Sequence, residues 1–260
     1  MKLIAADYDG TLNYCGKVTE EDLKALQKWQ AEGNLFVIDT GRSLESIRIE
    51  ADRNGLEPDY FITNNGGMVF DKDSKQLNAS FMDNGLAHEL MHMGLHLDGA
   101  VCFVANDGIY RHRIMVNPQL EDHRYTLAPD LTFDELLALN RYSQIVFSMD
   151  DMEKASALAA ELNEKYGDRI EAYANRWVVD IVRKGVSKAT GLDFLAKYLG
   201  MEKEDIYTLG DADNDIPMIE YCLHGACIET GVEEARAKAK IICAGVVDLI
   251  RIIKEKSEGL

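Results

Sequence analysis

Residues 3–11 read LIAADYDGT, and this stretch decides the fold that the rest of the chain has to complete. Its apolar residues run into two aspartates and a Gly-Thr break, a pattern typical of a buried strand that ends in a turn. Asp7 then lies at the carboxyl end of a strand, where open α/β sheets bind ligands. Gly10 lets the chain bend, so that Asp7 and Asp9 can serve one reacting group as covalent nucleophile and proton shuttle. An ordinary turn stabilised by aspartate side chains is the alternative interpretation.

The composition argues against several classes of function. The chain has 260 residues and a formal net charge of −17 at pH 7, which would repel a nucleic-acid backbone. The same charge would repel a phosphorylated metabolite, unless a metal ion and a local lysine reverse the field at the site. No apolar stretch approaches the length of a membrane span, and the apolar run at the amino terminus is too short for the apolar region of a signal peptide. Five scattered cysteines without a CxxC pair indicate reduced thiols and a cytoplasmic protein.

Strands and helices alternate at both ends of the chain. Apolar runs at 34–40 and 60–63 predict two more buried strands, and helical spacing predicts a helix between each strand and the next. This order is typical of a parallel sheet with right-handed crossovers. The alternation returns with a helix at 187–199 and a strand at 206–209. We therefore expect an α/β fold, a doubly wound parallel sheet of the Rossmann-like kind.

The middle of the chain has a different pattern. A hairpin is predicted over 101–112, about the turn at 106–108, because two strand-like runs flank a glycine-containing turn. The other elements predicted here are helices at 83–97, 131–139 and 152–166, and strands at 143–148, 170–173 and 177–182. Strands and helices segregated in this way predict an α+β unit inserted into the parallel sheet.

Polar side chains follow several strands of the predicted sheet. They are Asp7 and Asp9 after the first strand, Thr40 after the second, and Asp211, Asn214 and Asp215 after the strand at 206–209. Lys188 opens the helix that leads to the last of these strands. The carboxyl ends of parallel strands meet at one edge of the sheet, so these groups should share one crevice. Several carboxylates in one crevice require a cation, and Mg²⁺ prefers such oxygen ligands.

These residues carry a resemblance that covers nearly the whole chain. The sequence resembles the phosphatases of the haloacid dehalogenase superfamily, in the Cof-like subgroup with a large α/β cap. Residues 7–11 match the DxDGT motif, residues 40–42 (Thr-Gly-Arg) the second motif, Lys188 the third, and residues 210–215 the fourth. The resemblance implies a core at 1–81 and 182–260 and an inserted cap at 82–181 that selects the substrate.

The resemblance also implies roles for single residues. Asp7 attacks phosphorus and forms an aspartyl-phosphate, while Asp9 protonates the leaving alcohol and then activates water. Mg²⁺ is bound by Asp7, by the backbone carbonyl of Asp9 and by Asp211, with Asp215 supporting from its outer shell. The phosphoryl oxygens are held by Thr40, Gly41, Arg42, Lys188 and Asn214. The substrate implied is a small phosphorylated metabolite, such as a sugar phosphate. A competitor for the role of Lys188 is Lys184, and the extra acid Asp213 is a departure from the family pattern.

Three other functions share part of this pattern. Residues 88–92 read HELMH, an HExxH match that would place His88 and His92 on one helix face, as in a zinc metalloprotease, with His96 extending the stripe. A stripe on a cap helix at the substrate entrance, or an ordinary solvated helix face, explains the same residues. A receiver module would share the nucleophile, the metal and a lysine, but it has no use for a proton shuttle at Asp9. A phosphomutase or phosphotransferase would use the same first steps as a phosphatase.

Overall fold

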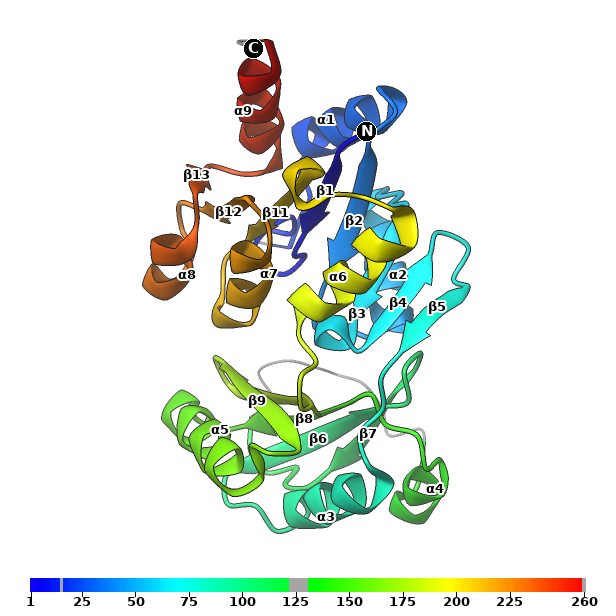
Figure 1. The fold of residues 1–260 in the computed structure, drawn as a ribbon. Helices are drawn as coiled ribbons and strands as arrows, with labels where there is room; N and C mark the ends of the chain where they lie inside the picture. The colour runs from blue at the N-terminus through cyan, green and yellow to red at the C-terminus, as the bar shows by residue number, and fades with distance from the viewer. Residues whose placement is uncertain (15, 122–130, 259–260) are drawn as a thin grey trace.

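The computed structural model describes residues 1–14, 16–121 and 131–258, and within these ranges the strands form two separate sheets (Figure 1). The larger sheet has eight strands in the order β13-β12-β11-β1-β2-β3-β4-β5. The strands from β13 through β3 are parallel, and β4 and β5 continue the sheet antiparallel. Their bounds are β1 (Leu3–Ala6), β2 (Leu35–Asp39), β3 (Tyr60–Thr63), β4 (Met68–Asp71), β5 (Gln76–Ala79), β11 (Ile206–Gly210), β12 (His224–Ile228) and β13 (Ile241–Cys243).

Helices cover both faces of this sheet. Their bounds are α1 (Glu20–Ala31), α2 (Leu44–Asn54), α6 (Lys188–Leu199), α7 (Ile216–Tyr221), α8 (Glu233–Lys238) and α9 (Val246–Glu258). Alternate residues of β1 point to opposite faces: Ile4 packs in the cluster that α1, α2 and α9 share, and Leu3 in the cluster that α6 and α7 share. The doubly wound α/β fold expected from the sequence is therefore confirmed.

The smaller sheet is antiparallel and has five strands in the order β7-β6-β8-β10-β9. Its strands are β6 (Ala100–Asn106), β7 (Arg111–Met115), β8 (Gln144–Met149), β9 (Ile170–Asn175) and β10 (Val178–Arg183), and its helices are α3 (Asn84–Gly94), α4 (Phe133–Ala138) and α5 (Met152–Tyr166). The helices α3 and α5 pack on one face of this sheet. Its other face, which we call the open face, turns toward the larger sheet (Figure 1) and carries a separate cluster of Val104, Val146 and Val178.

Two features of the chain differ from the sequence-based expectations. The hairpin of β4 and β5 was not predicted, because these short strands lack the alternation that marks a hairpin. The helix predicted over 83–97 ends at Gly94, where an added Cβ would lie 2.6 Å from Phe147 Cε1.

Four cysteines are free and buried, while Cys15 lies outside the described residues. None of the described helices combines the length and the apolar character that a membrane crossing requires.

Candidate active site

The candidate site lies where β1, β2 and β11 end and where α6 begins. Asp7 directly follows β1, and its backbone N–H donates to Leu209 O on β11 at 2.9 Å. Lys188 is the first residue of α6, and the side chain of Ser187 caps that helix by accepting from Thr190 N. The capped helix start holds the lysine against the strand ends, so the expected convergence of strand ends is present.

Lys188 lies at the centre of the site. Its side chain is fully buried, and Nζ donates to Asp7 Oδ1 at 2.5 Å and to Asp215 Oδ1 at 2.6 Å. The competing residue, Lys184, is about half exposed and pairs instead with Glu171 Oε1 at 2.8 Å. The geometry therefore distinguishes the two lysines that the sequence left open, and Lys188 is the one inside the site.

Asp211 and Asp215 are held in place by their own loop. The second oxygen of Asp215 accepts from the backbone N–H groups of Asp211 at 2.8 Å and Ala212 at 2.9 Å. Asp211 Oδ1 accepts from Thr11 Oγ1 at 2.7 Å. Gly10 has φ +95°, and a Cβ at this position would lie 2.4 Å from Asp211 Oδ2, so only glycine allows the two loops to approach this closely.

The site holds more acids than cations. Asp7, Asp211 and Asp215 each offer an oxygen within 4.8 Å of the other two, and among the described residues this is the group that could hold a metal ion. Burial raises the pKa of Asp211 to about 6, with the charge of Asp215 adding to the effect. Burial also raises the pKa of Asp7 well above its usual value, and Lys188 offsets this only in part. A further cation would relieve the excess negative charge, and the all-oxygen donor set fits Mg²⁺.

The end of β3 contributes a residue that the sequence analysis missed. Asn65, buried and in the left-handed conformation with φ +53°, follows β3, and its N–H donates to Thr40 O at 3.1 Å. Its side-chain oxygen accepts from Asn214 Nδ2 at 3.1 Å and would lie 3.1 Å from a Cβ placed on Gly41. Asn65 thus joins the second and fourth motifs. The signal was the run of two asparagines and two glycines directly after a strand.

Asp9 and Arg42 pair with each other at the edge of the site. Arg42 Nε and Nη2 donate to Asp9 Oδ2 and Oδ1 at 2.6 and 2.7 Å, and about half of the Asp9 side chain is exposed. The guanidinium also lies over the ring of Tyr8, 5.3 Å from its centroid. Arg42 was expected among the phosphate-binding residues, and the structure places its guanidinium on the carboxylate of Asp9.

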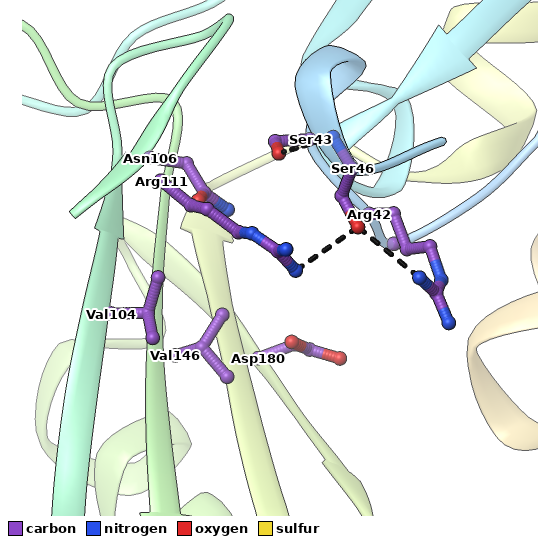
Figure 2. Close-up of a pocket in the computed structure, with 9 residues that line it drawn as sticks. Arg42, Ser43, Ser46, Val104, Asn106, Arg111, Val146 and Asp180 are labelled. Atoms are coloured by element: carbon purple, nitrogen blue, oxygen red, sulfur yellow. Dashed lines mark hydrogen bonds between the residues drawn. The ribbon is translucent and has the colours of Figure 1, made fainter. Parts of the chain in front are cut away.

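A small pocket separates Arg42 from the open face of the five-stranded sheet (Figure 2). Its free volume is about 20 Å³, which is room for one water molecule rather than for a metabolite. The residues around it are Gly41, Arg42, Ser43 and Ser46 from the larger sheet's side and Val104, Asn106, Arg111, Val146 and Asp180 from the smaller. The loop after β2 and the start of α2 are therefore close to the open face beside the site.

The histidine stripe lies elsewhere. Helix α3 packs on the face of the smaller sheet that is turned away from the larger one (Figure 1). His88 Nε2 is 3.2 Å from Tyr142 Oη, His92 packs edge-on against Phe133, and Glu89 accepts from Tyr166 Oη at 2.6 Å. These histidines belong to no metal-binding group within the described ranges, and α3 is not at the substrate entrance suggested for it.

Comparison with protein families identifies the class. The family model of haloacid dehalogenase-like hydrolases matches residues 4–247. The chain belongs to this family, and the resemblance seen in its four motifs to the Cof-like phosphatases is confirmed. The chain is accordingly a phosphatase enzyme.

Similar proteins cover the chain almost completely. The 5-amino-6-(5-phospho-D-ribitylamino)uracil phosphatase YwtE of Bacillus subtilis is 24% identical over 93% of this chain and 92% of its own. The HMP-PP phosphatase of Serratia proteamaculans is 24% identical over 91% of this chain and 86% of its own. Among solved structures, the subclass IIB sugar phosphatase BT4131 superposes with a TM-score of 0.80, at 20% identity and 99% coverage of both chains. This last likeness supports the fold.

Proposed function

We propose that the chain is a Mg²⁺-dependent phosphatase that hydrolyses a small phosphorylated metabolite through an aspartyl-phosphate on Asp7. The observation that carries the proposal is the cluster of Asp7, Asp211 and Asp215, of which the buried Asp7 and Asp215 are both paired with the buried Lys188. Such a cluster has no structural advantage, because burying charges costs free energy unless each is paired and hydrogen-bonded. Phosphoryl transfer needs this kind of pre-organised charge, since its transition state is stabilised mainly by positioning and electrostatics.

The residues divide the reaction into two steps. In the first, a carboxylate oxygen of Asp7 attacks phosphorus, the bond to the leaving oxygen breaks, and Asp9, which enters this step as the protonated acid, gives its proton to that oxygen and becomes a carboxylate. In the second, Asp9 takes a proton from water, whose oxygen attacks the same phosphorus, and the bond to Asp7 breaks. The products are an alcohol and inorganic phosphate, and both aspartates return to their starting states.

Mg²⁺ would be held by Asp7, Asp211 and the backbone carbonyl of Asp9. When bound, it would neutralise charge on the phosphoryl oxygens and offset the excess of acids in the site. Asp215 supports from outside the first coordination sphere, because its oxygens are already engaged by Lys188 and two backbone N–H groups. Its loop thereby keeps Asp211 at a fixed position, which is the usual task of residues behind a metal ligand.

The phosphoryl group would be bound at the ends of β2 and β11. The hydroxyl of Thr40 accepts from Arg42 N at 3.2 Å, which leaves its proton free to be donated to a phosphoryl oxygen. Backbone groups of Gly41, the ammonium of Lys188 and the amide of Asn214 complete the set. Asn65 holds Asn214 and the Thr40 loop in register, so we add it as a supporting residue.

Residues 82–181 would act as the cap that selects the substrate, with the open face turned to the leaving group. The proteins named above are phosphatases of HMP-PP, of 5-amino-6-(5-phospho-D-ribitylamino)uracil and of sugar phosphates, and we propose a small phosphorylated metabolite for this chain as well. The net charge of −17 supports the expectation that nucleic acid is not a partner.

The test is a hydrolysis screen against phosphorylated metabolites that include the three classes above, with and without chelator. We expect turnover with Mg²⁺, a loss of at least about 100-fold in excess chelator, and no measurable turnover for Asp7→Asn at unchanged fold. Asp9→Asn should fall by about 100-fold or more for lack of proton transfer. Undiminished hydrolysis in chelator would refute the mechanism, and transfer of phosphate to a second metabolite instead of water would indicate a mutase.

A further inference from the structure

The hydroxyl of Ser46 connects an arginine of the smaller sheet to the arginine that pairs with Asp9, the proposed acid/base residue. Arg111 on β7 donates from Nη1 to Ser46 Oγ at 3.0 Å, and Arg42 donates from Nη1 to the same oxygen at 3.2 Å (Figure 2). Arg42 in turn holds both oxygens of Asp9. The smaller sheet therefore reaches Asp9 through a chain of three side chains, Arg111, Ser46 and Arg42, and the link between the two parts of the molecule is the contact of β7 with α2.

The hydroxyl oxygen between the arginines is buried and accepts from both of them. Ser46 is on α2 and is buried, and a serine oxygen has two lone pairs, which the two guanidinium groups can both occupy. Its place on the helix is set by the cap of α2, where Ser43 Oγ accepts from Ser46 N at 3.4 Å. Ser46 thus gives Arg42 and Arg111 a common hydrogen-bond acceptor on α2.

Arg42 also has contacts with residues on the larger sheet's side. Its guanidinium lies over the Tyr8 ring and is 3.9 Å from Glu50 Oε1, and Tyr8 Oη donates to Glu50 at 3.2 Å. These contacts place the guanidinium of Arg42 near Asp9 from the side of the larger sheet. Its orientation depends in addition on Ser46, whose hydroxyl is oriented by Arg111.

We propose that Arg111 is a positioning residue, which fixes the carboxylate of Asp9 through Ser46 and Arg42 when the cap is closed. The inference rests on the proposed function, in which Asp9 donates the proton to the leaving group. Arg111 touches no reacting atom in this scheme. Its effect is that proton transfer becomes efficient only in the closed arrangement, when bulk water is excluded from the site.

The proposal predicts a signature that a structural or substrate-binding role would not produce. An alcohol leaving group needs the proton from Asp9, whereas a nitrophenolate leaves well without it. With Arg111→Gln, kcat/KM for an alkyl phosphate should fall by about tenfold or more, and for 4-nitrophenyl phosphate by less than about twofold. Ser46→Ala should show the same ratio, and Arg111→Lys, which keeps a donor, should recover part of the loss.

The matched control is Arg113→Gln, two residues along the same strand. Arg113 donates to Met115 Sδ rather than to Ser46, so its loss should leave the ratio of the two substrates unchanged. Thermal melting of every variant checks that the fold is intact. An equal fall for both substrates in Arg111→Gln, or the same ratio for Arg113→Gln, would overturn the proposal. Absence of Asp7-dependent hydrolysis in the wild-type chain would instead overturn the proposed function.

Discussion

The acid cluster around Lys188 and the histidine stripe on α3 both match known motifs, but only the cluster brings its side chains to one point in the part of the chain that the structure describes. The cluster draws its residues from segments far apart in sequence, with Lys188 and Asp7 separated by 181 positions. The HExxH residues come from a single helix whose spacing would suit a metal, yet His88, Glu89 and His92 contact three different neighbours. A local spacing places side chains on one face of a helix, while only tertiary convergence brings them to one point.

The two regions also differ in what holds their polar groups. In the cluster, each carboxylate is partnered by another functional residue or by a backbone N–H of its own loop. In the stripe, the partners are tyrosines and a phenylalanine of the smaller sheet's core, so the polar atoms serve packing. We therefore expect substitutions in the cluster to be costly and substitutions in the stripe to be mild.

The largest effect is expected for Lys188→Met. Removing the ammonium leaves Asp7 and Asp215 buried without their cation, so the free energy of unfolding should fall by about 3–5 kcal/mol in the absence of Mg²⁺. The matched control is Lys184→Met, whose half-exposed pair with Glu171 should cost less than about 1 kcal/mol. Urea unfolding in chelator measures both. Similar losses for the two variants would contradict the central position given to Lys188.

A smaller effect of opposite sign is expected for Asp39→Asn. Asp39 is fully buried next to the cluster, and its carboxylate oxygens have no hydrogen-bond partner among the described residues. Burial raises its pKa well above the usual value, with Lys188 offsetting this in part. The folded chain then binds a proton at Asp39 more tightly than the unfolded chain does. The contribution of this proton to the free energy of unfolding is fully present below about pH 4 and is lost as the pH rises toward the pKa of the folded state.

The asparagine variant lacks this titration. Its free energy of unfolding should exceed that of the wild type by about 1 kcal/mol at pH 8, and the gap should shrink toward pH 4. Asp59→Asn is the control, because Asp59 Oδ2 accepts from Phe36 N at 2.8 Å and from Gln30 Nε2 at 3.0 Å. That variant should lose stability instead. Urea unfolding at several pH values compares them, and a pH-independent gap for Asp39→Asn would disprove the interpretation.

The smallest effect is expected when His88 and His92 are both replaced by Gln. The stripe lies on the far side of the smaller sheet, so hydrolysis of 4-nitrophenyl phosphate should change by less than about twofold, or about 0.4 kcal/mol in the barrier. Metal content should be the same before and after the replacement. Stoichiometric zinc that disappears together with activity would restore the metalloenzyme interpretation.

Much of the fold was predictable because the parallel sheet repeats a simple rule. Buried strands that end in polar residues and alternate with capped helices predict both the sheet and the edge at which Asp7 and Asp211 meet. The predicted helix at 152–166 matches α5, and the predicted hairpin is the pair β6 and β7. These elements have strong local signals that their tertiary surroundings reinforce.

What could not be predicted depends on contacts between distant side chains. Arg42 carries the right motif for a phosphate ligand, but its guanidinium lies on Asp9 because Tyr8 and Ser46 hold it there. Asn65 carries no motif and belongs to the site because its left-handed backbone turns its amide toward Asn214. Spacing along the chain does not contain this information.

The wide separation of Asp7 and Lys188 also has a consequence for biosynthesis. The strand β1 is made first, but its neighbour β11 leaves the ribosome only after the whole of the smaller sheet has been synthesised. The strands β6 to β10 pair only with one another, so they can form their ladder while β1 still lacks one side. A growing chain therefore carries Asp7, the proposed nucleophile, from the start without Lys188, and we expect it to be inert until synthesis is nearly finished.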